Sequence, residues 1–356
     1  MLPFLPIYRS ARNQASFQAS FDRYGFIDNA KAIGMILVVL GHSRGLPDYL
    51  VKLIFSFHVP LFFFISGFLI KPGKLETTIY RNAGKVLQTL AIPYLLFFLL
   101  AFLYWLVTRN VGAKALLSAG QAWHAPIVGL FTGLESDLFV DPPLWFFPCL
   151  ILTAITYHAA RKFLSLTAAA CLFTALAFVV TLLWKIFPYR LPLGLDSMWI
   201  ALSFYALGQY IREKIFFSDI KAGYLFIILL IASALLVFAE LFNGRVDLAN
   251  MLFGQRPALY LLTALLGIIA TFAVSALLPT SGISRWISKN TLTIFPVHFI
   301  FLSLTRGVAV SLHMIPGDYT YAIGWSVVSS AVSILLCVPL VYFLQRLPVP
   351  ITRNAR

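Results

Sequence analysis

The sequence predicts an all-α, polytopic integral membrane protein with about ten transmembrane helices and both termini in the cytoplasm. The chain is 60% hydrophobic and only 11% charged, whereas soluble domains carry about 25% charged residues. A water-facing globule cannot bury that much apolar surface, and the mean hydropathy of +0.88 agrees. The apolar residues also occur in runs of about 20, the length that spans a bilayer as a helix.

Ten segments meet this length criterion, although polar residues interrupt the first, fourth and sixth. We expect the spans at residues 27–46, 50–70, 88–108, 143–160, 164–187, 193–212, 222–242, 257–279, 290–311 and 321–344. They divide the chain into a cytoplasmic N-terminal segment (1–26), a transmembrane domain (27–345) and a cytoplasmic tail (346–356). The first 26 residues have no continuous apolar core, so they do not resemble a cleavable signal peptide.

The orientation is predicted from the basic residues of the short loops. Most of the 27 Lys and Arg residues fall on one side if the N-terminus is inside, and cytoplasmic loops are enriched in them. Most of the 13 Asp and Glu residues fall near the other side. Membrane topology and attraction to anionic lipid explain this excess of basic residues on the inner face. A more specific explanation adds an anionic ligand from the cytosol. Nucleic acid is not expected as a partner, because the basic residues are scattered over short loops.

The three cysteines give no sign of a metal site or a disulfide framework. Cys149, Cys171 and Cys337 all lie in apolar runs and lack C-x-x-C spacing. We interpret them as small apolar packing residues and expect no metal ion.

The first span carries a lysine and a histidine on one stripe. Lys31 and His42 are eleven residues apart, so on a straight helix they differ by only about 20° and lie about 16 Å apart along the axis. This places a cation near one membrane surface and an imidazole deep in the bilayer. Ionisable residues inside a span are costly and are functional candidates. For Lys31 a local ion pair with Asp28 is the structural alternative.

Two more histidines occur in apolar runs. His58 enters from the opposite surface, at a depth that can match that of His42. Pro60 frees a backbone carbonyl beside it and is expected to kink the helix, as in segments that line cavities. His42 and His58 can instead be neutral packing residues that hydrogen-bond to the backbone. His298 is the third, and for it packing or orientation is favoured over catalysis.

Arg81 and Lys85 stand four residues apart before the third span, so they can share a helix face. With Lys31 they can form a basic cytoplasmic mouth for a phosphate group. Their ordinary role in topology is an equally good explanation.

The motifs resemble one family. The stretches I27-D-N-A-K-A-I-G-M-I-L-V-V-L-G-H42 and F57-H-V-P-L-F-F-F-I-S-G-F68 are similar to those of the membrane-bound acyltransferase 3 family. They look closest to the branch with fucose O-acetylases and nodulation-factor and exopolysaccharide acyltransferases. R81-N-A-G-K85, P143-L-W-F-F147 and K289-N-T-L-T-I-F-P-V-H298 resemble further family motifs.

This resemblance implies an acyl-CoA donor, most often acetyl-CoA, and no tightly bound cofactor. It assigns catalysis to His42, with His58 beside it, and the grip on CoA phosphates to Lys31, Arg81 and Lys85. Lys31 stands where the family typically has an arginine. His42 can act as a general base or as a nucleophile that carries the acyl group, and Ser66 is a weaker candidate to polarise the carbonyl.

The acceptor is expected on the outer side, and the resemblance implies a hydroxyl of a cell-envelope or exported glycan, free or lipid-linked. Carboxylates and indoles suit sugars, and the candidates are Asp141, Trp145, Asp196 and Glu240, with Trp199. For any one of them taken singly, ordinary interfacial anchoring is the favoured explanation.

The prediction is thus a multi-pass O-acyltransferase of the bacterial inner membrane. Acetyl is the acyl group that the resemblance favours. A proton-coupled transporter or flippase for a lipid-linked glycan is the alternative, although no internal repeat is visible. A non-catalytic scaffold is the third hypothesis. The sequence leaves open the acceptor, succinyl as against acetyl transfer, and the oligomeric state.

Overall fold

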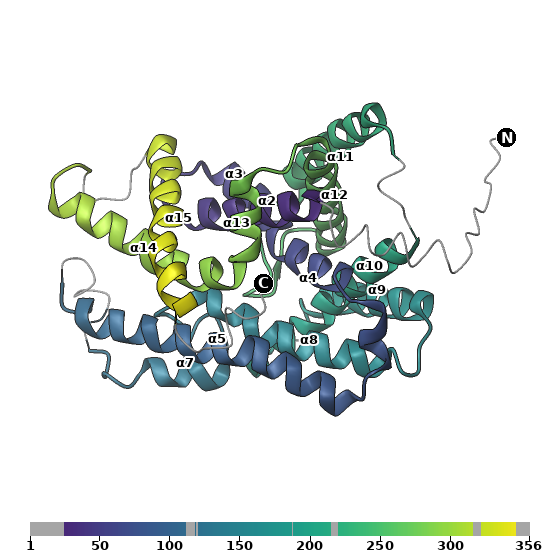
Figure 1. Ribbon diagram of the computed structural model, residues 1–356, viewed down its shortest axis with the longest axis horizontal. Coiled ribbons are helices and arrows are strands. Elements are labelled where there is room, and N and C mark those ends of the chain that lie inside the picture. Colours follow the sequence, from purple (N-terminus) through teal and green to yellow (C-terminus); the bar gives the residue numbers. More distant parts are fainter. Residues whose placement is uncertain are drawn as a thin grey trace.

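The structure, a computed structural model, describes residues 25–111, 118, 120–186, 188–214, 220–315 and 322–346. Residues 1–24 of the predicted N-terminal segment (1–26) and 347–356 of the predicted tail (346–356) lie outside the described residues. The described part is a bundle of α-helices (Figure 1), with helical segments α2 (Gly25–His42), α3 (Asp48–Phe55), α4 (His58–Phe68), η1 (Pro72–Glu76), α5 (Ile79–Thr108), α7 (Pro126–Thr132), η2 (Pro142–Trp145), α8 (Phe146–Ala160), α9 (Leu166–Leu183), η3 (Pro192–Gly194), α10 (Met198–Lys214), α11 (Ala222–Asn243), α12 (Pro257–Leu277), α13 (Gly282–Lys289), α14 (Thr291–Ser311) and α15 (Ile323–Arg346).

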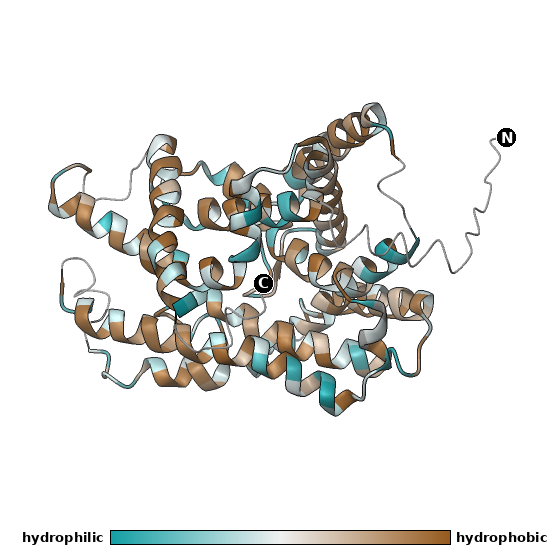
Figure 2. Ribbon diagram, viewed as in Figure 1, coloured by the Kyte–Doolittle hydropathy of each residue, from teal (hydrophilic) through white to brown (hydrophobic). Residues whose placement is uncertain are grey.

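Nine helical segments of the described chain are long and apolar enough to cross a membrane. They match nine of the ten predicted spans, and hydrophobic residues dominate their length (Figure 2). The remaining prediction, 193–212, corresponds to α10, which has only 17 residues. Ser197 at one end of α10 donates to the carbonyl of Leu248, and Arg212 at the other donates to the carbonyl of Phe68, where α4 ends. Helix α10 therefore runs beside α4 along the bundle. The orientation of the two termini relative to the membrane stays a prediction.

Two glycines let α4 and α10 pack backbone to backbone. A Cβ on Gly67 would lie 1.9 Å from the carbonyl oxygen of Tyr205, and one on Gly208 would lie 2.0 Å from that of Phe64. Small residues allow such close approach where helices associate in lipid. These two glycines therefore allow α10 to pack closely against α4, although α10 is the least apolar of the predicted spans.

The second predicted span, 50–70, is two helices with a break at Ser56 and Phe57. Phe57 has φ −139° and ψ −16°, outside helical geometry. Pro60 has no N–H to continue the hydrogen-bond ladder, and the Phe57 ring lies against Gly267 of α12, where a Cβ would be 2.1 Å from it. The break turns the start of α4 toward the end of α2.

Three local features differ from the predictions. Helix α5 begins at Ile79, not near residue 88, because the Thr78 side chain accepts from the N–H of Arg81 and caps the helix. Arg81 and Lys85 therefore lie on a helix. Residues 282–289 form α13, a short helix packed on α2, and a two-stranded hairpin joins β1 (Val246–Asp247) to β2 (Leu252–Phe253).

Candidate functional site

Helix α2 brings His42 to the broken α3–α4 segment through two glycines. Gly34 and Gly41 are seven residues apart, so they lie on nearly the same helix face. A Cβ on Gly34 would lie 2.9 Å from the Leu61 side chain, and one on Gly41 would lie 3.1 Å from that of Ile54. Only glycine permits this approach without displacing those side chains. His42, the last residue of α2, is placed beside them.

Three histidines from three helices meet at this point. The ring centroids of His42 and His58 are 6.3 Å apart, and those of His42 and His298 are 5.2 Å apart. Phe55 packs against both His42 and His58, at 5.4 and 4.8 Å. His58 and His298 are buried, whereas His42 is partly exposed. His42 is thus the member of the cluster that a ligand can reach.

Backbone hydrogen bonds set the tautomers of His58 and His298. Nδ1 of His58 lies 2.9 Å from the carbonyl oxygen of Ile54, and Nδ1 of His298 lies 2.5 Å from that of Phe295. A carbonyl only accepts, so in each ring Nδ1 carries the proton and Nε2 keeps a lone pair. Among the described residues the His42 ring makes no hydrogen bond, so both of its nitrogens are available for proton transfer.

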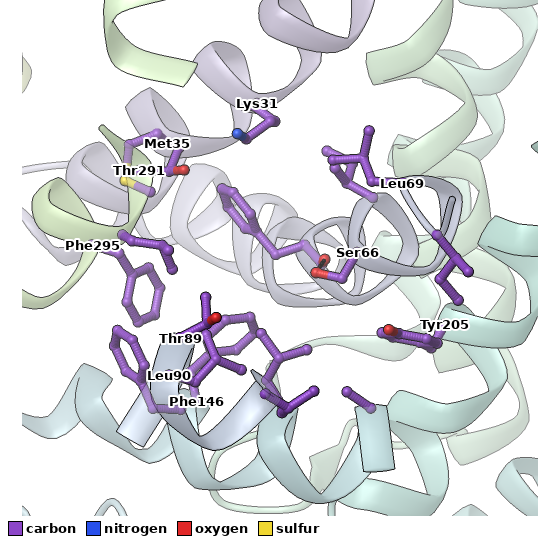
Figure 3. Close-up of a pocket in the computed structure, with 18 of the residues that line it drawn as sticks. Lys31, Met35, Ser66, Leu69, Thr89, Leu90, Phe146, Tyr205, Thr291 and Phe295 are labelled. Atoms are coloured by element: carbon purple, nitrogen blue, oxygen red, sulfur yellow. Dashed lines mark hydrogen bonds between the residues drawn. The ribbon is translucent and has the colours of Figure 1, made fainter. Parts of the chain in front are cut away.

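A cavity of about 450 Å³, here called the inner cavity, opens on the other side of this cluster. Lys31 of α2 and Lys85 of α5 line it, together with Ser66 of α4 and many apolar side chains. Figure 3 shows Lys31 and Thr291 on one wall, with Phe295 and Phe146 at one end and Tyr205 toward the other. The cavity is therefore mainly apolar, with two cations at its wall.

Ser288 of α13 holds the Lys31 end of the cavity. The Lys31 ammonium donates to the Ser288 carbonyl at 2.6 Å, and the Ser288 hydroxyl donates to Asp28 at 2.6 Å. This positions Lys31 through α13, in addition to the electrostatic attraction of Asp28. Arg81 lies one turn before Lys85 on α5 and is exposed outside the cavity wall. Ser66 donates to the carbonyl of Phe62 and lies in the inner cavity, apart from His42.

A layer of phenylalanine rings separates the inner cavity from the histidines. The Phe295 ring centroid is 5.0 Å from that of Phe146, 6.4 Å from that of Phe62 and 6.0 Å from the His298 ring. Phe295 lines the inner cavity on one side and a small cavity next to His42 on the other. One aromatic ring therefore stands between the two spaces.

His42 faces two spaces at the opposite end of the bundle. The first, the outer cavity, has a volume of about 340 Å³ and is lined by Arg44, Arg306 and several polar and aromatic side chains. The second, the small cavity of about 40 Å³, is lined by His42, His58, Glu135 and Asp247. Burial is the largest cause that raises the pKa of Glu135, and the Asp247 charge adds to it. The hydrogen bond with Asn250 and the charges of Arg190 and Arg245 act in the opposite direction. His42 thus lies between the outer cavity, which two arginines line, and the small cavity, which two carboxyl groups line.

The four acceptor candidates from the sequence do not gather at one place. Trp145 lines the small cavity beside His42. Asp196 is held by Arg190 at 2.6 Å and accepts from the N–H of Ser197. Asp141 and Glu240 are buried, and their carboxylate oxygens have no hydrogen-bond partner in the described chain. Of the four, Trp145 alone lines a cavity that reaches His42.

Sequence reasoning missed the residues that line the outer cavity. Arg44 follows His42 by two positions, near the end of the predicted span 27–46. Arg306 lies in the last turns of α14, eight residues after His298. The spacing from the histidines is the signal that could have singled out both arginines.

Comparison with known proteins gives one result. A family model described as an acyltransferase domain matches residues 24–342, which is most of the chain and includes every residue of the site described above. No curated protein sequence and no solved structure matches the chain.

Proposed function

Since the chain belongs to the acyltransferase 3 family, we propose that this membrane acyltransferase moves an acyl group from acyl-CoA to a hydroxyl of a cell-envelope or exported glycan. Acetyl is the proposed acyl group and the bacterial inner membrane the proposed location. The observation that carries the proposal is the position of His42, where the outer cavity and the histidine cluster meet above the lysine-lined inner cavity.

The inner cavity fits the donor. CoA carries phosphates at one end and a long, thin pantetheine arm at the other. Lys31 and Lys85 suit the phosphate groups, with Arg81 one turn further along α5 toward the predicted cytosol. The apolar wall suits the arm, whose thioester would point at Phe295. For the thioester to pass that ring, the Phe295 side chain has to turn aside.

His42 supplies the proton transfers. As the acceptor hydroxyl attacks the thioester carbon, a His42 nitrogen takes its proton, the C–S bond breaks, and the proton passes to the leaving thiolate. The products are an O-acyl ester and free CoA. In the covalent variant His42 attacks the thioester first and releases the CoA thiolate. The acceptor hydroxyl then attacks the acyl-imidazole, the ester forms and the His42 imidazole leaves. The lone pair of His58 or His298 can receive a proton from His42 in either route, and Glu135 lies at the same small cavity.

The test uses purified protein in proteoliposomes with radiolabelled acetyl-CoA and envelope glycan. His42→Ala should lower label transfer by about 10²- to 10⁴-fold, the contribution of general acid–base catalysis. His124→Ala, at an exposed loop histidine, is the matched control and should keep wild-type transfer. Both proteins should elute as folded, monodisperse species.

Near-wild-type transfer by His42→Ala would overturn the catalytic assignment. Absence of label transfer by the wild type, with transmembrane movement of the glycan, would favour the transporter hypothesis instead.

A further inference from the structure

The wall of the outer cavity has a distinct chemical character. It contains two guanidinium groups, of Arg44 and Arg306, and none of its described lining residues is Asp or Glu. A third guanidinium lies directly behind the wall, because Arg109 stacks on Trp105 at 4.4 Å and donates to the carbonyl of Gln121. Trp105 and Gln121 both line the cavity. The described wall of this cavity is therefore basic.

The same wall offers groups that bind sugars. Tyr104 donates to the hydroxyl of Ser303 at 3.2 Å, which places two hydroxyl groups side by side on the wall. Trp325 and Phe299 provide aromatic faces. The volume of about 340 Å³ lies within the range of small-molecule sites, about 300–1,000 Å³. The cavity has room for a sugar unit of a larger glycan.

Arg44 is fixed in relation to His42. The Ser326 hydroxyl at the start of α15 donates to the Arg44 carbonyl at 2.8 Å, and α2 ends two residues earlier. The loop between α2 and α3 is thereby tied to α15, so the backbone that carries Arg44 has a defined position at the cavity that reaches His42. A charge bound by Arg44 would lie near the hydroxyl that reacts.

The acidic groups near His42 face a different space. Glu135 and Asp247 line the small cavity of about 40 Å³, which holds only a few water molecules, since each needs about 10–15 Å³ on this measure. A sugar unit does not fit there. The acidic and basic groups on the two sides of His42 therefore do not compete for one ligand.

We infer that the outer cavity is the acceptor subsite and that it takes a glycan unit carrying a negative charge, a carboxylate or a phosphate, within reach of Arg44 and Arg306. The inference rests on the proposed acyltransferase function and names the chemical class of its acceptor. The charge has two sources: an acidic sugar such as a uronate, or the phosphate that links a sugar to a lipid carrier.

Binding and transfer are measured separately. Binding of three probes, methyl β-glucoside, methyl β-glucuronide and α-glucose 1-phosphate, is measured by saturation-transfer NMR and calorimetry on the His42→Ala protein in nanodiscs. Acetyl transfer to the same probes is measured on the wild type. At least one anionic probe should bind about tenfold more tightly than the neutral glucoside, as expected for charge-assisted hydrogen bonds. Preference for the glucuronide identifies a uronate, and preference for the phosphate identifies a lipid-linked sugar.

Charge-neutral variants test the assignment to residues. Arg44→Gln and Arg306→Gln should each lower the affinity for the preferred anionic probe about five- to tenfold and leave that for the glucoside within twofold. Arg256→Gln is the matched control, because this exposed arginine stacks on Phe242 and lines none of the three cavities. It should change neither affinity.

The outcomes separate the two proposals. Equal affinity for neutral and anionic probes, no binding of any probe, or an anion preference that survives in the Arg44→Gln/Arg306→Gln double variant overturns the inference. If acetyl transfer proceeds equally well to the glucoside, the acyltransferase function stands and the charge selection falls. If the anionic probe binds through both arginines and no acetyl transfer to any acceptor occurs, the site stands and the proposed function falls.

Discussion

The inner cavity has cations on the wall of a mainly apolar chamber, whereas the outer cavity combines arginines, hydroxyls and aromatic rings. Lysine presents a compact charge, while the planar guanidinium of arginine can grip a carboxylate or phosphate with two parallel hydrogen bonds. The difference indicates two kinds of ligand. A flexible chain with a charged end suits the first cavity, and a rigid polar ring suits the second.

The largest effect expected from the comparison concerns the donor cations. The double variant Lys31→Gln/Lys85→Gln should raise the KM for acetyl-CoA by about 10²-fold or more, because each charge-assisted hydrogen bond contributes about 1.5–3 kcal/mol. Steady-state kinetics with each substrate varied in turn check this. The KM for the acceptor should stay within twofold. A parallel rise in both constants would break the division of roles between the cavities.

The second effect concerns His58. The substitution His58→Asn distinguishes its hydrogen bond to the backbone from its role in proton transfer. His58→Asn keeps an N–H donor near the position of Nδ1 and removes the Nε2 lone pair. We expect kcat to fall about tenfold, with both KM values little changed, because His42 loses a neighbouring proton acceptor. The pH profile of kcat should also shift. Unaltered kcat and pH profile would reduce His58 to a packing residue.

A smaller effect is expected at the ring between the two spaces. Phe295→Ala removes the side chain that lines both the inner cavity and the small cavity. Water should then reach the thioester more easily, so the ratio of acetyl-CoA hydrolysis to acetyl transfer should rise about three- to tenfold. Free CoA release and labelled ester are counted in the same reaction. Phe131→Ala, at an exposed ring of α7, is the control and should leave the ratio unchanged.

The smallest effect concerns stability and the buried Asp141. Burial raises the pKa of Asp141 well above its ordinary value, so the folded protein favours the neutral carboxyl. The stability that the neutral Asp141 carboxyl contributes is fully present below the unfolded pKa of about 3.9. This contribution is lost as the pH rises through the folded pKa. Asp141→Asn should raise Tm at pH 7 by about 2–4 °C for each kcal/mol of burial cost removed.

Thermal unfolding of the two proteins between pH 4 and pH 8 checks this prediction. The difference in Tm should shrink toward pH 4. If the Asn variant is less stable at pH 7, or loses acceptor binding while Tm is unchanged, then Asp141 carries a ligand contact as the sequence first suggested.

The approximate positions of the spanning segments could be predicted, nine of ten matching, because lipid demands long apolar runs. Their ends and breaks could not. The break at Ser56 and Phe57 depends on the Phe57 ring lying against Gly267 of a distant helix, and Thr78 starts α5 at residues too polar for a hydropathy window. Helix α13 is also polar on one face, so only its packing on α2 identifies it.

For the site, spacing on one helix placed Lys31 and His42 on a common stripe, and that logic is local. The contact of His42 with His298 joins α2 to α14 and depends on tertiary packing. The acceptor side was harder still. Asp196 looks like a sugar ligand in the sequence but is paired with Arg190. Arg306 looks like an ordinary charge near the end of the predicted span 290–311, yet it lines the outer cavity.

The central claim is that donor and acceptor reach His42 from opposite membrane faces. The direct measurement uses sealed membrane vesicles of both orientations, with labelled acetyl-CoA outside and acceptor glycan either trapped inside or added outside. We expect transfer only when acetyl-CoA is on the face that carries Lys31 and Lys85 and the acceptor is on the face that carries Arg44. Equal transfer with both substrates on one face of intact vesicles would contradict it.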